Sequence, residues 1–275
     1  MNIINSFSID LEDWYQGNEK IKLSDFHLYE NRIEYSTDLI LDLFEKYNIK
    51  STFFVLGDIA KNNPNLIKKV HSKGHEIASH GYSHEIVYLQ TPSQFQQELR
   101  DSKNILEDII GERIIGHRAS NWSITEKSLW ALDILKEEGF LYDSSIYPTK
   151  NYLFGIPDAP RFAHRLENGL WEVPPSTIKY FNKTLPFAGG FFLRALHRYI
   201  INFGIRKFNE NNQPAIMYLH PWELDLGQPK RLPVPLKNNI IHYWGLATTE
   251  NKLNYIFSKH QFGRLDSIYK TEIFK

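Results

Sequence analysis

The chain has 275 residues, no cysteine, and 32 basic and 32 acidic side chains, so its formal net charge at pH 7 is zero. The length suits one large α/β domain, and the absence of cysteine excludes disulfide bonds and thiolate metal ligands. Because the charge is balanced, we expect no nucleic-acid partner. The N-terminal stretch MNIINSFSIDLEDWYQ lacks a basic start and a long apolar run, and no run of about eighteen apolar residues follows. We therefore expect a cytoplasmic protein with no integral membrane segment; peripheral contact at the inner face of a membrane stays open.

Short apolar runs typical of strands alternate with amphipathic stretches. The runs predict strands at residues 3–9, 51–56, 76–78, 113–116, 170–173, 215–219 and 264–268. The amphipathic stretches predict helices at residues 39–47, 128–138 and 191–208, and a further helix with Thr91 as N-cap and Pro92 at the first helical position. This alternation indicates repeated βα units and a parallel sheet in a single domain, either open or closed into a barrel.

Polar side chains collect where the predicted strands end. They are Asp10, Glu12 and Asp13 after the first strand, His80 and His84 after the third, Arg118 after the fourth, and His220 after the strand AIMYL. In parallel α/β folds the functional groups lie at the carboxyl ends of the strands. The pattern therefore predicts one shared site.

The stretch SHGYSH places His80 and His84 four residues apart. On a helical turn this spacing would point both rings toward one ion, and Asp13 or Glu12 could add a carboxylate ligand. Two histidines and a carboxylate leave room for water, as in catalytic zinc sites. Taken alone, the same spacing also suits an ordinary polar turn.

Five motifs occur in an order that resembles one known family. They are FSIDLEDW, SHGYSH, GHRASNWSI, YDSSIYP and MYLHPWE, within residues 6–224. The chain resembles the polysaccharide deacetylases (NodB homology, carbohydrate esterase family 4), and within them the branch associated with exopolysaccharide or lipopolysaccharide synthesis. The resemblance implies a distorted (β/α)7-type barrel, Zn²⁺ or another divalent metal, and hydrolysis of an N-acetyl group. We expect one domain over residues 1–275, with a C-terminal extension, residues 225–275, packed on the barrel.

The resemblance also implies roles for individual residues. Asp10 resembles the catalytic base, Arg118 the arginine that orients this base, and His220 the general acid. Asp143 resembles the residue that tunes the catalytic histidine or arginine network, and it could equally be a turn former. His80 and His84 match the metal ligands. We choose Asp13 as the third ligand and keep Glu12 as the alternative, because the family's adjacent aspartates are separated here.

Aromatic residues accompany the motifs. Trp14, Tyr82, Trp122 and Trp222 lie beside the predicted catalytic positions, where their faces could stack on a sugar ring, although each could instead belong to the core. The segment AGGFF, residues 188–192, resembles a feature of the same branch and suits either a groove wall or packing.

We expect a metal-dependent carbohydrate N-deacetylase. Its substrate would be an N-acetylhexosamine unit of a cell-surface polysaccharide or of its lipid-linked precursor. Two alternatives stay open: a metal-independent amidohydrolase of the same fold that acts on another C–N bond, and a catalytically silent glycan-binding protein. The sugar, its linkage, the chain length and the oligomeric state are not determined by the sequence.

Overall fold

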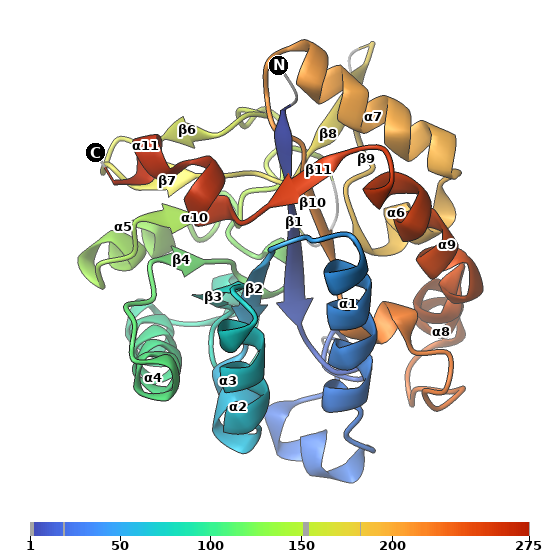
Figure 1. Ribbon diagram of the computed structural model, residues 1–275. Coiled ribbons are helices and arrows are strands. Elements are labelled where there is room, and N and C mark those ends of the chain that lie inside the picture. Colours follow the sequence, from blue (N-terminus) through green and yellow to red (C-terminus); the bar gives the residue numbers. More distant parts are fainter. Residues whose placement is uncertain (1–2, 19, 151–153, 182, 275) are drawn as a thin grey trace.

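The structure is a computed structural model that describes residues 3–18, 20–150, 154–181 and 183–274 (Figure 1). The outer limits of the expected domain, residues 1 and 275, lie outside this range. Parallel strands form the sheet in the order β10, β1, β2, β3, β4, β5, β7, with β6 antiparallel to β7 and β11 paired with the start of β1. Their bounds are β1 (Ile4–Leu11), β2 (Thr52–Val55), β3 (Glu76–Ser79), β4 (Gly116–His117), β5 (Tyr142–Asp143), β6 (His164–Arg165), β7 (Trp171–Glu172), β10 (Ile216–Leu219) and β11 (Gln261–Gly263).

The curled sheet is closed by a loop instead of a regular strand pair. The amide of Ser176 donates to the carbonyl of Ile216 over 3.1 Å, and the amide of Ile216 donates back to Ser176 Oγ over 2.8 Å. Gly189 forms an isolated bridge with Tyr218 next to this contact. A separate hairpin, β8 (Thr177–Tyr180) and β9 (Lys183–Pro186), follows the closure. The predicted distorted (β/α)7-type barrel in a single domain is confirmed.

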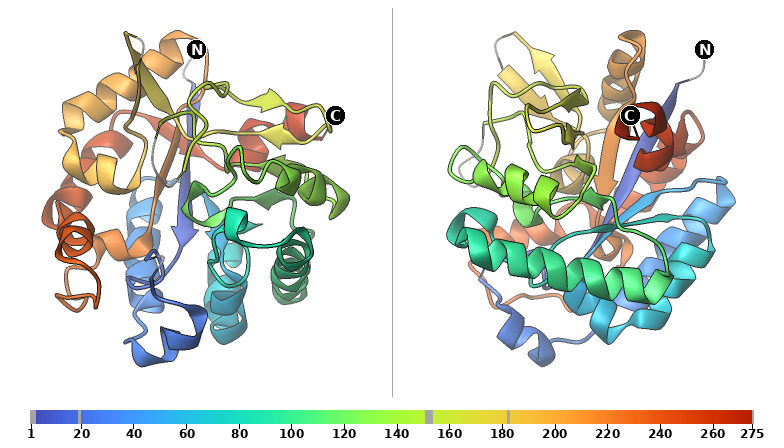
Figure 2. Two further views of the ribbon diagram at one scale, coloured as in Figure 1. Left: turned by 180° about the vertical axis from the view of Figure 1, so that it is seen from behind. Right: turned by 90° about the vertical axis from the view of Figure 1, so that its left-hand side faces the viewer.

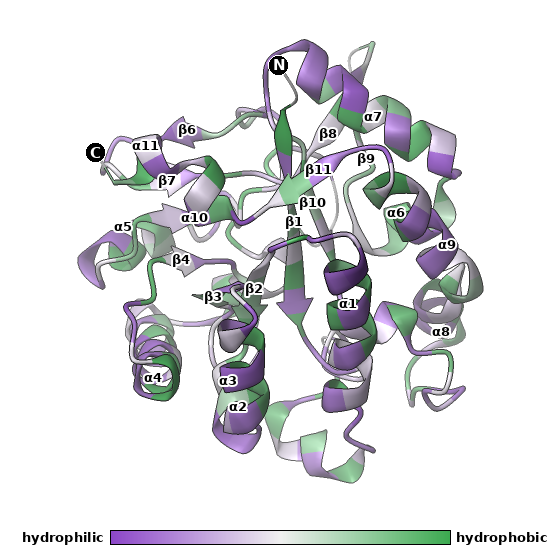
Figure 3. Ribbon diagram, viewed as in Figure 1, coloured by the Kyte–Doolittle hydropathy of each residue, from purple (hydrophilic) through white to green (hydrophobic). Residues whose placement is uncertain are grey.

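Helices surround the outside of the curled sheet (Figure 2). They are α1 (Ile33–Lys46), α2 (Gly57–Asn62), α3 (Pro64–Ser72), α4 (Pro92–Ile110), α5 (Trp130–Glu137), α6 (Gly190–Ala195), α7 (Arg198–Glu210), α8 (Leu236–Tyr243), α9 (Leu246–Phe257), α10 (Leu265–Ile268) and α11 (Lys270–Ile273). Most of them carry apolar and polar stretches together, as a helix with one buried face does (Figure 3). The expected start of α4 is confirmed, because Thr91 and Gln94 form a capping box.

Two expected elements are wrong. The single helix expected over residues 191–208 is split into α6 and α7, because Leu196 is extended and His197 caps α7 through its side chain. The strand expected at residues 264–268 is the helix α10; the strand lies just before it, where Gln261 pairs with Ile4. The apolar residues Leu265 and Ile268 are three apart, which is a helical spacing.

Strand β1 separates the core from the site. Its odd-numbered residues Phe7, Ile9 and Leu11 belong to the main core cluster, and the ring of Phe7 meets that of Phe44 of α1 edge-on at 5.9 Å. Because side chains alternate along a strand, Ser8 and Asp10 point to the opposite side, which is the inside of the barrel. The polar groups of the site are thus carried by a strand whose other face is fixed by packing.

Candidate metal centre and active site

Glu12, and not Asp13, meets the two histidines. Strand β1 stays paired with β2 as far as Leu11, so the alternation of side chains continues and Glu12 follows Asp10 onto the inner face. Glu12 Oε1 lies 2.9 Å from His80 Nε2 and 3.0 Å from His84 Nε2. One ligand atom from each of these three buried residues lies within 4.8 Å of the others. This grouping has the donor types of a His₂-carboxylate metal site.

The Glu12 carboxylate is buried and only partly satisfied. Its second oxygen, Oε2, has no hydrogen-bond partner among the described residues. Burial alone would raise the pKa of Glu12, but the charges of His84 and His220 and the hydrogen bonds from His80 and His84 hold this pKa well below its usual range. A carboxylate that stays charged with a free lone pair is suited to bind a cation.

A loop, and not the expected helical turn, brings the two histidines together. Gly81 and His84 both have positive φ angles, of 77° and 64°, which fold the chain back after β3. The Glu98 carboxylate fixes this loop, because its Oε2 accepts hydrogen bonds from the amides of Tyr82 and Ser83. His80 Nδ1 lies 2.7 Å from the carbonyl of Arg118, so its Nε2 is directed to Glu12.

The choice of Asp13 as metal ligand is corrected. Its Oδ1 accepts a hydrogen bond from the amide of Trp14, and its Oδ2 accepts one of 2.7 Å from the amide of Arg32, next to the start of α1. Burial raises the pKa of Asp13 to about 6, although these backbone donors lower it. Asp13 therefore holds the N-terminus of α1, which needs acceptors for its free amides.

Asp10 and Arg118 form a buried ion pair beside the histidines. Arg118 Nη1 lies 2.5 Å from Asp10 Oδ1 and also donates to Ser8 Oγ over 2.9 Å, while its Nη2 donates to Ser144 Oγ over 3.0 Å. The guanidinium lies 4.0 Å from the ring centroid of Phe54. These contacts fix the fork of Arg118 in one orientation, so Asp10 is held in place.

Asp143 lies behind this pair and contacts neither Arg118 nor His220 through a hydrogen bond among the described residues. Its Oδ1 lies 2.8 Å from His117 Nδ1 and accepts a hydrogen bond of 2.7 Å from Ser145 Oγ. Ser145 Oγ in turn accepts from the amide of Ala119. Asp143 thus braces the segment that carries Arg118, and the side chain that reaches Arg118 directly comes from the next residue, Ser144.

His220 is oriented by residues whose roles the sequence analysis did not identify. Its Nδ1 lies 2.7 Å from Glu223 Oε1, and its Nε2 lies 4.0 Å from Glu12 Oε2. The other oxygen of Glu223 accepts a 2.5 Å hydrogen bond from Arg194 Nε. Burial alone would lower the pKa of His220, but Glu12 and Glu223 outweigh burial and raise it to about 9. The sequence signal that could have indicated the role of Glu223 was its position three residues after the histidine in MYLHPWE.

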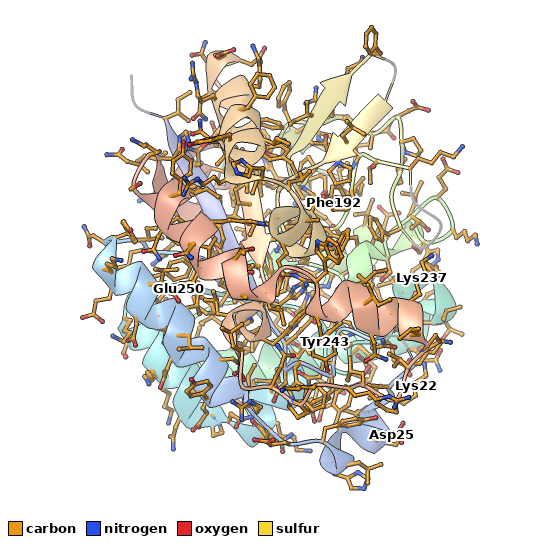
Figure 4. All side chains as sticks on the ribbon, turned by 90° about the vertical axis from the view of Figure 1, so that its right-hand side faces the viewer. Lys22, Asp25, Phe192, Lys237, Tyr243 and Glu250 are labelled. Carbon is orange, nitrogen blue, oxygen red and sulfur yellow. The ribbon has the colours of Figure 1, made fainter. Side chains whose placement is uncertain are left out.

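A cavity of about 360 Å³ opens over Asp10, Glu12 and His220. Its wall also contains Trp122 and Trp222, Phe154, Phe191 and Phe192, and Lys237, Asn238, Ile241 and His242 of α8. Figure 4 views the molecule from the side of α8 and labels Phe192 and Lys237. The aromatic faces and the few polar groups suit a small ligand with an apolar side and hydroxyl groups.

Two of the four expected aromatic contacts are corrected. Trp14 and Tyr82 do not line the cavity. Trp14 is buried, and its Nε1 donates to the carbonyl of Glu30, while the ring of Tyr82 packs at Gly57, the first residue of α2. Trp222 does reach the cavity, and its ring stacks on His220 at a centroid distance of 5.4 Å. The AGGFF segment contributes to the cavity wall through Phe191 and Phe192.

Two family profiles match adjacent parts of the chain. Residues 29–140 match "Polysaccharide deacetylase", and residues 144–270 match "Domain of unknown function (DUF3473)". The chain is 33% identical over 107 residues to the peptidoglycan deacetylase of Helicobacter pylori, which covers 39% of this chain and 36% of that protein. It is 32% identical over 137 residues to the peptidoglycan-N-acetylmuramic acid deacetylase PdaA of Bacillus subtilis, which covers 49% of each protein. These alignments span about half or less of the relatives' lengths.

The crystal structure of a Mycobacterium smegmatis protein assigned as a polysaccharide deacetylase has the same fold. The TM-score is 0.66 at 18% identity, over 97% of this chain and 88% of that one. Residues 29–140 thus match the polysaccharide deacetylases, of the NodB-like, carbohydrate esterase 4 type, and the chain shares the fold of that crystal structure. The narrower assignment to the exopolysaccharide- or lipopolysaccharide-associated branch stays a prediction. Within the described part of the chain, no helix is both long and apolar enough to cross a membrane.

Proposed function

We propose that the protein is a metal-dependent carbohydrate N-deacetylase. One observation carries the proposal: Asp10, Glu12 and His220 line a single cavity, where Glu12 meets His80 and His84 from behind and Arg118 holds Asp10. Water adds to the acetyl carbonyl carbon, the C–N bond breaks, and acetate and a free amine leave. Each group needed for this hydrolysis has a candidate residue at the floor of the cavity.

The residues fit a divalent cation such as Zn²⁺. Glu12, His80 and His84 would hold it, because their donor atoms already converge and Glu12 Oε2 is a buried oxygen without a hydrogen-bond partner among the described residues. When bound, the cation would supply Lewis-acid stabilisation of the negative charge that develops on the attacked carbonyl oxygen.

Asp10 would act as the base. Its carboxylate lines the cavity and is fixed by Arg118, so it can accept the proton of the attacking water without reorienting. Arg118 would act by positioning Asp10. Asp143 accepts a hydrogen bond from Ser145 Oγ and would in this way support the loop that carries Arg118. It would take no direct part in proton transfer.

His220 would act as the acid. With a pKa raised to about 9, its imidazole is protonated at neutral pH and can give a proton to the leaving amine nitrogen. Glu223 accepts from Nδ1 and leaves Nε2 as the nitrogen that faces Glu12 and the cavity. Trp122, Trp222 and the phenylalanines of the wall would hold the sugar ring.

The proposed substrate is an N-acetylhexosamine unit of a cell-surface glycan or of its lipid-linked precursor, and we place the protein in the cytoplasm. Three lines support a glycan substrate: the five ordered motifs, the matched deacetylase profile, and the aromatic cavity. The whole chain, residues 1–275, would act as one domain in which residues 225–275 complete the cavity wall through α8.

Acetate release tests this proposal. The purified protein is stripped with a chelator and supplied with Zn²⁺, and acetate is measured with chitin oligosaccharides, peptidoglycan fragments and lipid-linked N-acetylhexosamines. We expect release that needs the cation and is lost in His80→Ala, while His71→Ala, a histidine on the outer helix α3, behaves as wild type. Release that survives the chelator would favour the metal-independent amidohydrolase. Glycan binding without release from any substrate would favour the silent binding protein.

A further inference from the structure

Helix α8 has a wall of the cavity on one side and an apolar face exposed to solvent on the other. Lys237, Asn238, Ile241 and His242 line the cavity. Leu236 and Ile240, four residues apart, share a neighbouring side of the helix and are 75% and 53% exposed, and Trp244, which ends the helix, is 56% exposed. None of the residues of α8 is buried. A helix that is amphipathic yet has no buried residue has an unpartnered face.

The segment that carries this face is positively charged. Between Leu226 and Thr249 the sequence contains Lys230, Arg231 and Lys237 and no aspartate or glutamate, although the whole chain is neutral. All three cations are exposed, and none forms an ion pair within the described ranges. Apolar side chains with tryptophan, framed by lysine and arginine, are typical of helices that lie in the surface of an anionic membrane.

The helix is held on the protein by polar contacts at its ends. Arg194 Nη1 donates to the carbonyls of His242 and Trp244, over 2.7 and 2.6 Å. The side chain of Asn239 holds the preceding loop, because it forms hydrogen bonds with the backbone of Leu232 and Val234. These contacts fix α8 without covering Leu236 or Ile240, so the exposed apolar face belongs to the folded state.

Helix α7 offers a second exposed apolar face but fits a membrane less well. Ile200 and Phe203 are 46% and 50% exposed. The opposite face of α7 is anchored in the core, and Lys207 lies over the ring of Phe203 and pairs with Glu210, so this cation is already engaged. No residue of α7 lines the cavity. The exposed residues Ile200 and Phe203 of α7 therefore serve as a matched control for membrane binding.

We propose that Leu236, Ile240 and Trp244, with Lys230, Arg231 and Lys237, form a docking surface for an anionic lipid bilayer. This inference rests on the proposed function, because docking through α8 would place the cavity next to the bilayer, where a lipid-linked sugar is presented. The bilayer is chosen over a protein partner because the apolar face and the uncompensated cations lie on the same short segment. Each lysine or arginine near an anionic surface strengthens binding to it.

Vesicle sedimentation tests the surface. The full chain is mixed with phosphatidylcholine vesicles with or without phosphatidylglycerol. We expect binding only to the anionic vesicles and weaker binding at high salt. The double variants Leu236→Ser/Ile240→Ser and Lys230→Gln/Arg231→Gln should each bind on the order of tenfold more weakly, whereas Ile200→Ser/Phe203→Ser should bind as wild type. Melting temperatures check that the variants are folded.

Three outcomes would overturn the docking surface. The first is absence of wild-type binding, and the second is equal binding by all variants. The third is dimerisation at high protein concentration that Leu236→Ser/Ile240→Ser removes, since the face would then serve a second copy of the chain. Acetate release from a water-soluble N-acetylated oligosaccharide, measured with the same variants, should be unchanged. If vesicle binding persists but no acetate is released by any form, the proposed function fails and the docking surface stands.

Discussion

Arg118 Nη1 donates a 2.5 Å hydrogen bond to Asp10 Oδ1, and both side chains are buried. The carboxylate comes from β1 and the guanidinium from the loop after β4, so the pair joins two strands that are not neighbours in the sheet. Removal of either partner would leave a buried charge without compensation, which is strongly destabilising. A test of the base must therefore keep the shape and the hydrogen bond of Asp10.

Asp10→Asn meets this requirement. We expect the rate constant kcat for acetate release to fall by about 10²–10⁴, because an amide cannot accept the proton of the attacking water. The bound metal, measured by elemental analysis, should be retained. Ser8→Ala removes another acceptor of the same guanidinium and should cost far less activity. Turnover near the wild-type value in Asp10→Asn would exclude Asp10 as the base.

Glu12→Ala and Asp13→Ala should have opposite effects. Glu12→Ala removes the carboxylate that meets both histidines, so we expect Zn²⁺ affinity, measured by calorimetric titration, to be lost. Asp13→Ala should keep Zn²⁺ affinity but lower the free energy of unfolding by about 1–3 kcal/mol, because the Arg32 amide loses its acceptor. Urea unfolding measures this loss. Retention of Zn²⁺ by Glu12→Ala together with its loss in Asp13→Ala would reverse the assignment.

Glu223→Gln should change the pH profile of kcat/KM. The proposed acid works only while His220 is protonated, so we expect activity below its pKa of about 9 and a fall as the pH rises through this value. Glu223 is one of the charges that raise this pKa, so its removal lowers the pKa and moves the alkaline fall to lower pH. Glu210→Gln, an exposed carboxylate of α7, should leave the profile unchanged. An unshifted profile in Glu223→Gln would show that His220 is not the acid.

His75 should make the stability depend on pH. Burial, with the charges of Lys50 and Lys73, lowers its pKa from 6.5 to about 4, and its Nδ1 accepts a hydrogen bond from the amide of Ser51. The folded state favours neutral His75, so its contribution is complete above pH 6.5 and is lost as the pH falls toward 4. The loss should reach roughly 3 kcal/mol.

Urea unfolding at a series of pH values between 4 and 8 measures this effect. His75→Phe should be less stable at pH 8, because Ser51 loses an acceptor, but should lose less stability than wild type on acidification. His71→Ala, on the outer helix α3, should follow the wild-type curve. Parallel curves for wild type and His75→Phe would show that His75 does not cause the loss of stability on acidification.

The barrel and most of the site could be predicted from the sequence because both depend on local patterns. Alternating strands and helices define the sheet, and the motifs place Asp10, His80, His84, Arg118 and His220 at its carboxyl edge. The choice between Glu12 and Asp13 required knowledge of where β1 ends. The end of β1 is set by its pairing with β2, which runs from Ser8 with Thr52 to Leu11 with Val55. It therefore depends on a second strand and cannot be predicted from the residues of β1 alone.

The cavity wall could not be predicted for a related reason. Phe154, Phe192 and His242 are distant in the sequence and meet only through tertiary packing. Of the four aromatic residues chosen from the motifs, Trp122 and Trp222 reach the cavity, whereas Trp14 and Tyr82 pack into neighbouring elements. Both of these residues lie in the loops that follow β1 and β3, so the course of the loop, and not proximity in sequence to a catalytic residue, decides whether they contact a ligand.

Arg194 connects two parts of the molecule that have different tasks. Its Nε holds Glu223, which orients His220, and its Nη1 holds the carbonyls at the end of α8. Any displacement of α8 would therefore alter the electric field at the proton donor. An exchange of residues 228–245 with those of a relative, made to change the substrate, would alter the strength of the acid as well. The position of this cavity wall and the charge beside His220 therefore depend on the same guanidinium.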